Sequence, residues 1–343
     1  MLDKVFFVKH LSIMIKSGLS LHEGILTIRE QTDSKQFKKI LDDVLKHLDN
    51  GESLGSSLAR HPQVFSELFV NMIRVGEASG TLEENLNHLA EQLKKSYELR
   101  RKIKAAMIYP VIILVATSGL IGGLSIFILP RLIPLFKSFD IELPLPTRIL
   151  MGFVEALQNY GIFILLGLIG FIMFLVFILQ IKKVKRLNDG LILKLPITSP
   201  ISRSSNLVQF TMTLGTLLKS GISVVEALDI SAGTIGNLVY REEIQKAASE
   251  IEKGKTISAH LKLREDLFPP TAFRMIEVGE KTGSLEDSLL YLAKFYEEEV
   301  DNLTKNLSTV FEPILLLVIG IVVGFVAVSI ILPIYKITGG LHG

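Results

Sequence analysis

The segment Gly254-Lys255-Thr256 has the residue types that close a phosphate-binding loop. In that loop, backbone N–H groups and a lysine ammonium hold phosphate oxygens, and the motif needs a further glycine five positions earlier, after a strand. The earlier position is Ser249, and no strand pattern precedes it. Gly254 therefore fits the end of a helix better than a nucleotide site.

The seven histidines suggest no other reactive constellation. We expect none of them to pair with a carboxylate on its own helix at the spacing of metal ligands, and no G-x-S-x-G elbow is present. Because the chain has no cysteine, thiolate metal sites, cysteine nucleophiles and disulfides are excluded. The sequence therefore predicts no catalytic residue, metal site or cofactor, and a protein that is not an enzyme.

The most informative pattern is a motif that occurs twice. Val75-Gly76-Glu77-Ala78-Ser79-Gly80 returns as Val278-Gly279-Glu280-Lys281-Thr282-Gly283, and 278 minus 75 gives an offset of 203 positions. The same offset, without a gap, brings Phe7 onto Phe210 and Leu129-Pro130 onto Leu332-Pro333. One constant offset over this length indicates an internal duplication.

Each copy of the motif places a glutamate between two glycines. The residues are Gly76, Glu77 and Gly80 in the first copy, and Gly279, Glu280 and Gly283 in the second. Glycine suits a tight helix-to-helix turn, and we expect each glutamate to accept hydrogen bonds from free N–H groups of that turn. A partner-binding loop is the alternative, which we disfavour because a binding site seldom needs two full copies.

The segments before the motif carry helical patterns in both copies. Apolar residues recur at helical spacing over 5–17 and 207–219, and a further helix is expected over 35–50 and again over 241–253. Ser20 with Glu23, and Ser223 with Glu226, have the spacing of capping boxes. No segment alternates like a strand, so each repeat is expected to be a bundle of short helices.

The composition points to a membrane. The chain has 343 residues, of which 48% are hydrophobic, and its mean hydropathy is +0.43. Lysine and arginine total 37 against 35 aspartates and glutamates, so no charge excess indicates nucleic acid.

Three uncharged runs are long enough to cross a bilayer, which takes about 20 residues. Two of them have a proline near the start, Pro110 and Pro313, where the first helical turn tolerates it. We therefore predict an all-α membrane protein with two duplicated cytoplasmic helical bundles and three transmembrane helices. Its parts are a bundle at 1–106, a span at 107–130, an extracytoplasmic loop at 131–160, a span at 161–181, a bundle at 182–312, a span at 313–335 and an extracytoplasmic tail at 336–343.

The orientation follows from basic residues, which accumulate on the cytoplasmic side of short flanks. They precede the first span and follow the second, at Lys94, Lys95, Arg100, Arg101, Lys102, Lys104, Lys182, Lys183, Lys185 and Arg186. The segment between these spans has fewer, so both bundles are expected in the cytoplasm.

The three spans contain no Asp, Glu, Lys, Arg or His. A proton- or ion-coupled carrier usually needs such groups near the bilayer centre, which disfavours a coupled transporter. The spans do contain two glycine pairs at the spacing that lets helices approach closely, Gly119 with Gly123 and Gly320 with Gly324. We expect close helix packing there, within the chain or between chains.

Two adjacent positions carry opposite charges in the two copies. Lys94 and Lys95 correspond to Glu297 and Glu298. Two unrelated solvated faces would explain this, and so would a bundle or subunit interface in which opposite charges fix the pairing. Both interpretations stay open.

The combined motifs closely resemble the type II secretion system protein F family, the inner-membrane platform proteins of type IV pili and type II secretion. They cover nearly the whole chain and include Lys16-Ser17-Gly18-Leu19-Ser20-Leu21, His61-Pro62, Tyr109-Pro110, Leu143-Pro144-Leu145-Pro146-Thr147 and Ile331-Leu332-Pro333-Ile334-Tyr335. Many members have an additional segment before the first bundle, whereas this sequence starts almost at the first repeat helix.

The resemblance implies a non-enzymatic, multi-pass platform in the bacterial inner membrane. Its expected partners are a hexameric assembly ATPase, pilin or pseudopilin subunits, other inner-membrane assembly proteins and further copies of itself. Two alternatives remain. Substrate-dependent flux would favour a transporter built from parallel repeats. A polar pocket between the bundles would favour a membrane-anchored enzyme.

Overall fold

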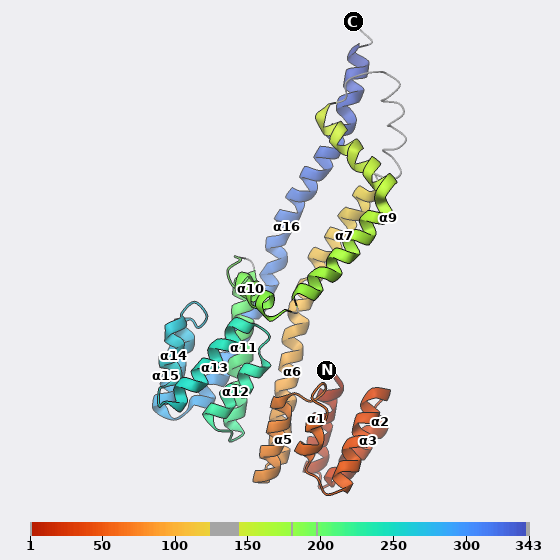
Figure 1. Ribbon diagram of the computed structural model, residues 1–343. Coiled ribbons are helices and arrows are strands. Elements are labelled where there is room, and N and C mark those ends of the chain that lie inside the picture. Colours follow the sequence, from red (N-terminus) through yellow and green to blue (C-terminus); the bar gives the residue numbers. More distant parts are fainter. Residues whose placement is uncertain (1, 124–143, 180, 197, 341–343) are drawn as a thin grey trace. The chain divides into compact units, whose positions relative to one another are not determined.

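The computed structural model describes residues 2–123, 144–179, 181–196 and 198–340 (Figure 1). Throughout these residues every regular element is a helix, which confirms the all-α class. The chain divides into two compact units. One contains Met1–Lys102 with Arg186–Leu303, and the other Ile103–Lys185 with Thr304–Gly343.

The first unit contains both repeats, and their helices follow the same order. The first repeat comprises α1 (Leu2–Lys16), α2 (Leu21–Gln31), α3 (Lys35–Asp49), α4 (Leu54–Ala59), α5 (Glu67–Ser79) and α6 (Leu82–Ala106). After α10 (Lys182–Ile192), the second comprises α11 (Thr198–Lys219), α12 (Val224–Thr234), α13 (Leu238–Glu252), α14 (Ile257–Leu261), the short 3₁₀ turn η2 (Lys262–Arg264), α15 (Pro270–Thr282) and the start of α16 (Leu285–Gly340).

Glycines end matching helices in the two repeats. Gly51 and Gly254 have φ angles of 82° and 86°, in the left-handed region that a side chain with a Cβ rarely adopts. The interpretation of Gly254 as a helix end is therefore confirmed.

The helix starts agree less well with the predictions. Ser20 forms the full capping box with Glu23, as expected, but the Ser223 side chain makes no cap hydrogen bond, so that prediction was wrong. The helix expected from residue 241 begins at Leu238, because the Asn237 side chain accepts from the first free N–H groups of α13.

The core of each bundle is built around a cluster of aromatic rings. Phe7 lies against Phe37 and Phe65, with ring centroids 6.1 and 6.0 Å away, and all three are almost fully buried. In the second repeat, the matched residues are Phe210, Tyr240 and Phe268. The ring centroid of Phe268 lies 5.8 Å from that of Phe210 and 5.4 Å from that of Tyr240. The phenol of Tyr240 donates to the Leu267 carbonyl at 2.6 Å, which satisfies the one polar group in that cluster.

The second unit contains the apolar helices α7 (Ile108–Gly123) and α9 (Leu145–Leu179) and the rest of α16. Among the residues that the structure describes, two helices are long and apolar enough to cross a membrane, or three if the bent pair Leu145–Ala156 and Asn159–Phe171 forms one span. Thr147 of α9 donates to the Ser329 carbonyl of α16 at 2.7 Å, beside a small apolar cluster of Leu150, Val154 and Ile330.

Two details of the predicted spans differ from the structure. Pro313 lies inside α16 rather than in a first helical turn, whereas Pro110 is the third residue of α7. The segment expected as a loop at 131–160 is helical from Leu145 onward. Residues 124–143 and 341–343 lie outside the described residues. The predicted 107–130 span, the loop and the tail can therefore be compared with the structure only in part.

Candidate functional site

The predicted turn glutamate of the first repeat binds a helix start. The Glu77 carboxylate, near the end of α5, accepts from the backbone N–H of Leu54 at 2.6 Å and of Gly55 at 2.9 Å. These are free N–H groups of the first turn of α4, where the helix dipole also favours a negative charge. The carboxylate therefore accepts backbone hydrogen bonds as expected, but from α4 rather than from its own turn.

The second repeat contains the same arrangement with one more donor. Glu280, near the end of α15, accepts from the backbone N–H of Ile257 at 2.5 Å and of Ser258 at 3.2 Å, in the first turn of α14. The Ser258 hydroxyl also donates to this carboxylate. Gly55 occupies the matched position in the first repeat and has no hydroxyl to contribute.

The glycines beside each glutamate let two helices meet closely. A Cβ on Gly76 would lie 2.9 Å from the Leu82 Cα at the start of α6, and one on Gly279 would lie 2.9 Å from the Leu285 Cα at the start of α16. Gly80 and Gly283 end α5 and α15 with φ angles of 73° and 72°. We call each segment, 76–82 and 279–285, a junction, because it connects the short helices of a bundle to the long helix that leads toward an apolar segment.

A buried glutamine connects the two repeats. Gln92 of α6 is 2% exposed. It donates to the Thr213 hydroxyl of α11 at 2.7 Å and accepts from the Thr216 hydroxyl at 3.2 Å. Both amide atoms of Gln92 are therefore satisfied by the other repeat.

An ion pair also connects the repeats. The Lys102 ammonium of α6 lies 2.8 Å from the Asp301 carboxylate and 3.8 Å from the Glu297 carboxylate, both in α16. The hydrogen bond to Asp301 raises the pKa of Lys102 above its ordinary value. Glu297 thus has a cationic partner in the first repeat, and that partner is Lys102.

The other charged positions proposed for an interface lie apart from this pair. Lys94 lies 4.0 Å from Glu98 in its own helix. Lys95 lines a hollow of about 150 Å³ between α6, α11 and α16, together with Gln92, Thr216 and Lys219, and Glu298 is exposed. A subunit interface at Lys94, Lys95, Glu297 and Glu298 therefore stays a prediction.

The glycine pairs of the apolar helices meet open space. A Cβ added to Gly119, Gly123, Gly320 or Gly324 would find nothing within 4 Å among the described residues. Close packing at these glycines, within the chain or between chains, stays a prediction.

Histidine–carboxylate pairs are more frequent than the sequence interpretation allowed. His47 lies 3.8 Å from Asp43 and His88 lies 3.8 Å from Glu84, each one helical turn apart, so the expectation of no such pairs was wrong. Across the described part of the chain, no group of three or more His, Asp or Glu side chains is arranged to hold a metal ion.

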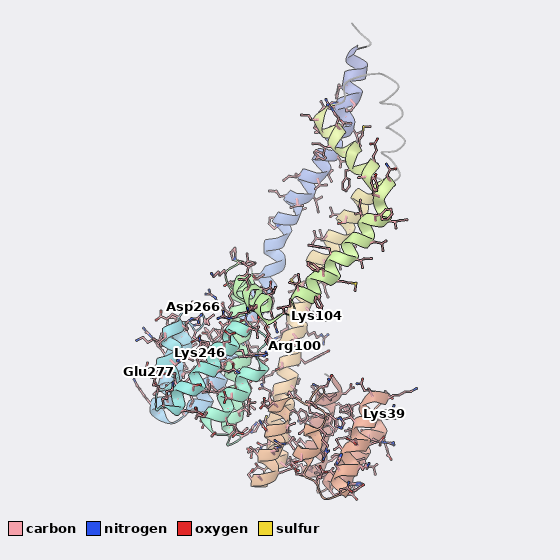
Figure 2. The ribbon with its side chains drawn as sticks, viewed as in Figure 1. Lys39, Arg100, Lys104, Lys246, Asp266 and Glu277 are labelled. Carbon is pink, nitrogen blue, oxygen red and sulfur yellow. The ribbon has the colours of Figure 1, made fainter. Side chains whose placement is uncertain are left out.

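His47 and His260 instead belong to ion-pair networks. In the first repeat, His47 hydrogen-bonds Glu52 at 2.9 Å, and this bond, with Arg60, lowers the pKa of Glu52. In the second, the buried Glu243 binds His260 at 3.1 Å, Arg264 at 2.8 Å and Lys246 at 3.3 Å. Lys246 is labelled in Figure 2.

Sequence reasoning missed Gln92, whose role depends on how two repeats pack. A signal was present, because Leu89, Gln92, Ser96 and Leu99 follow each other at helical core spacing and all are buried. Two polar residues on such a stripe indicate a buried polar contact with another helix.

Comparison with known proteins gives the same duplication. The family described as type II secretion system (T2SS), protein F matches residues 7–130 and residues 210–333. A type IV pilus assembly protein PilC of Thermus thermophilus is 34% identical over 99% of this chain and 83% of its own length. PilC of Myxococcus xanthus is 32% identical over 99% of this chain and 81% of its own. The type II secretion system protein F of Aeromonas hydrophila is 30% identical over 98% and 86%.

Proposed function

The chain belongs to the type II secretion system protein F family, and we propose that it is the membrane platform of a type IV pilus or type II secretion machine. The observation that carries the proposal is the extent of the match. Both family domains are present, and proteins named for pilus assembly and for secretion align with nearly the whole chain.

We propose three spans in the cytoplasmic membrane, with both bundles in the cytoplasm. Apolar helices of sufficient length support the spans, and the basic residues before residue 107 and after residue 181 support the orientation. The bundles are then available to cytoplasmic proteins, and the apolar helices to proteins within the bilayer.

In this role the bundles contact a hexameric assembly ATPase, and the platform transmits the motor's movement to pilin or pseudopilin subunits. The chain contributes no catalysis, because the energy comes from the motor. The two junctions are the points through which movement of a bundle would reach the long helices, since α6 and α16 both begin there.

The test compares two exposed positions that differ in environment. Tyr291 in α16 and Phe171 in α9 are both 57% exposed, so a photo-crosslinking residue at either one should leave the fold intact. In native membranes we expect the position-291 probe to capture the ATPase and the position-171 probe to capture a pilin-like subunit.

Capture of the ATPase at 171, or of extracytoplasmic proteins at 291, would contradict the orientation. Consistent failure to recover an ATPase or a pilin-like subunit from either position would contradict the platform role. Substrate-dependent flux in proteoliposomes would support a transporter instead.

A further inference from the structure

Helix α10 exposes a row of leucines. Leu187 is 77% exposed and Leu191 is 55% exposed, four residues further along the same face. Leu195, four residues beyond and just after the helix, is 45% exposed. Large apolar side chains at helical spacing form a continuous apolar surface, which is unfavourable in water.

The opposite face of α10 is fixed to the second bundle. Asp189, which is buried, accepts from the backbone N–H of Leu238 at 2.8 Å, in the first turn of α13. Arg186 pairs with Glu242 at 2.8 Å. Asp189 is two positions from both Leu187 and Leu191, so it points roughly the opposite way on the helix, and its contact with α13 holds these leucines outward.

The row lies directly after a predicted span in the sequence. Lys182, the first residue of α10, directly follows the uncharged run 161–181. Lys182 and Lys183 are exposed, and so is Lys194, between Leu191 and Leu195. A lysine can place its ammonium among lipid phosphates while its methylene groups lie against the acyl chains.

We propose that α10 lies in the surface of the bilayer, with the three leucines inserted at the acyl boundary and the lysines on phosphate groups of anionic phospholipids. This arrangement rests on the membrane position in the proposed function. Leucine insertion and lysine attraction are the two contributions that bind amphipathic helices to anionic bilayers. Through Asp189, such a contact would fix the second bundle against the membrane.

The absence of cysteine makes the test direct, because any introduced cysteine carries the only nitroxide label. The full chain is reconstituted without other proteins in nanodiscs of phosphatidylcholine and phosphatidylglycerol. The measured quantity is how often the label collides with each of two reagents. Oxygen enters the bilayer, whereas a nickel chelate stays in water, so a high oxygen-to-nickel collision ratio indicates a label in lipid. The variants are Leu187→Cys, Leu191→Cys and two controls.

The first control is Leu263→Cys in η2, because Leu263 is 76% exposed, close to the 77% of Leu187, but lies far from any predicted span in sequence. The second is Ile169→Cys, within the uncharged run 161–181. We expect the oxygen-to-nickel collision ratio at 187 and 191 to be several-fold higher than at 263, and to approach the ratio at 169.

Equal ratios at 187 and 263, with 169 in lipid, would overturn the α10 proposal and leave the platform role intact. A water-exposed label at 169 would overturn both. A label at 187 that is shielded from both reagents would assign the leucines to a protein contact. Dipolar broadening of the nitroxide spectrum that disappears when labelled protein is diluted with unlabelled protein would assign them to a contact between copies of the chain. Either result would overturn the proposal.

The lipid charge is tested separately. In the Leu187→Cys background, Lys183→Gln and Lys194→Gln should each lower the equilibrium constant for insertion about fivefold, since a basic residue near an anionic surface contributes about that factor. Pure phosphatidylcholine should remove the difference between these variants and their parent. An unchanged ratio in all cases would exclude the anionic headgroup.

Discussion

Glu77 and Glu280 occupy matched positions in the two repeats, and each accepts two backbone hydrogen bonds from the first turn of a short helix, α4 or α14. The contact spans 22 or 23 residues of sequence in both repeats. Each carboxylate thereby connects the end of a bundle's fifth helix to the start of its fourth. The junction that leads to the long helix is held against the rest of the bundle by this contact.

Glu77→Gln should therefore loosen α4. The amide retains one acceptor oxygen but presents an NH₂ group to the second donor and removes the charge. We expect the opening free energy of the Leu54 and Gly55 amides to fall by about 1.5–3 kcal/mol, the typical contribution of a hydrogen bond to a charged group. Hydrogen exchange followed at these two amides measures it.

The matched control is Glu30→Gln, which removes the same charge from an exposed position in the same repeat. It should leave α4 protection unchanged. If Glu77→Gln leaves exchange and melting unaffected but abolishes capture of a partner, the glutamate belongs to a binding loop and the structural interpretation is wrong.

Gly76→Ala should strain the first junction. The new methyl group would lie 2.9 Å from the Leu82 Cα, a backbone atom that a rotamer change cannot move. Overpacking of this kind costs about 1–3 kcal/mol, and Gly279→Ala should have a similar effect in the second repeat. Thermal melting followed by circular dichroism checks both.

Gly236→Ala provides the comparison for the glycine variants, because a Cβ there meets nothing within 4 Å. Its melting temperature should equal that of the parent. Equal melting of the 76 and 236 variants would show that the two helices separate at little cost, and the junction would not be a rigid contact.

The duplication made much of the fold predictable, because a pattern seen at both positions is less easily mistaken for chance. The helix expected over 35–50 is observed as Lys35–Asp49. Local rules were less dependable at Ser223, which is the first-turn cap of α12 by position but whose hydroxyl makes no cap bond. The acceptor role of Glu77 was predicted from its neighbours, but its partners were not, since Leu54 and Gly55 lie 23 and 22 residues earlier in the chain.

Gln92→Leu should weaken the contact between the repeats. The change removes the 2.7 Å hydrogen bond that Gln92 donates to the buried Thr213 hydroxyl and leaves that hydroxyl with the longer bond from Gln209 at 3.3 Å. Losing a hydrogen bond within a protein costs about 0.5–1.5 kcal/mol. Combining it with Thr213→Val removes both polar groups, so the double variant should recover part of the loss. Chemical denaturation of the four proteins of this cycle measures the coupling, and strict additivity would exclude it.

Acid should affect the second bundle through Glu250. Hydrogen bonds from Lys253 and Lys255 lower its pKa to about 2, from about 4.3 in an unfolded chain. A carboxyl with a lowered pKa binds fewer protons when folded, so its contribution is present above the unfolded pKa and is lost as the pH falls toward 2. We expect Glu250→Gln to reduce the dependence of the melting temperature on pH between about 4.3 and 2.

Glu252→Gln is the control for this pH profile, because it removes an exposed charge from the same helix. Its profile should follow that of the parent. A Glu250→Gln profile that is also unchanged would show that the lysine contacts do not persist in solution.

Charge reversal at Lys94 and Lys95 tests the predicted subunit interface. If these lysines face Glu297 and Glu298 of another copy, Lys94→Glu with Lys95→Glu should lower the oligomer mass in detergent, measured by light scattering. Reversing Glu297 and Glu298 to lysine should then restore it, because opposite charges fix pairing.

Lys102 separates this subunit contact from the one within the chain. Its ammonium lies 3.8 Å from Glu297 and 2.8 Å from Asp301, so Lys102→Glu should destabilise the contact between the repeats and leave the oligomer mass unchanged. If the reversals at 297 and 298 restore no oligomer, or if Lys102→Glu alone dissociates it, then Lys94 and Lys95 are solvated residues of α6 and the subunit prediction is wrong.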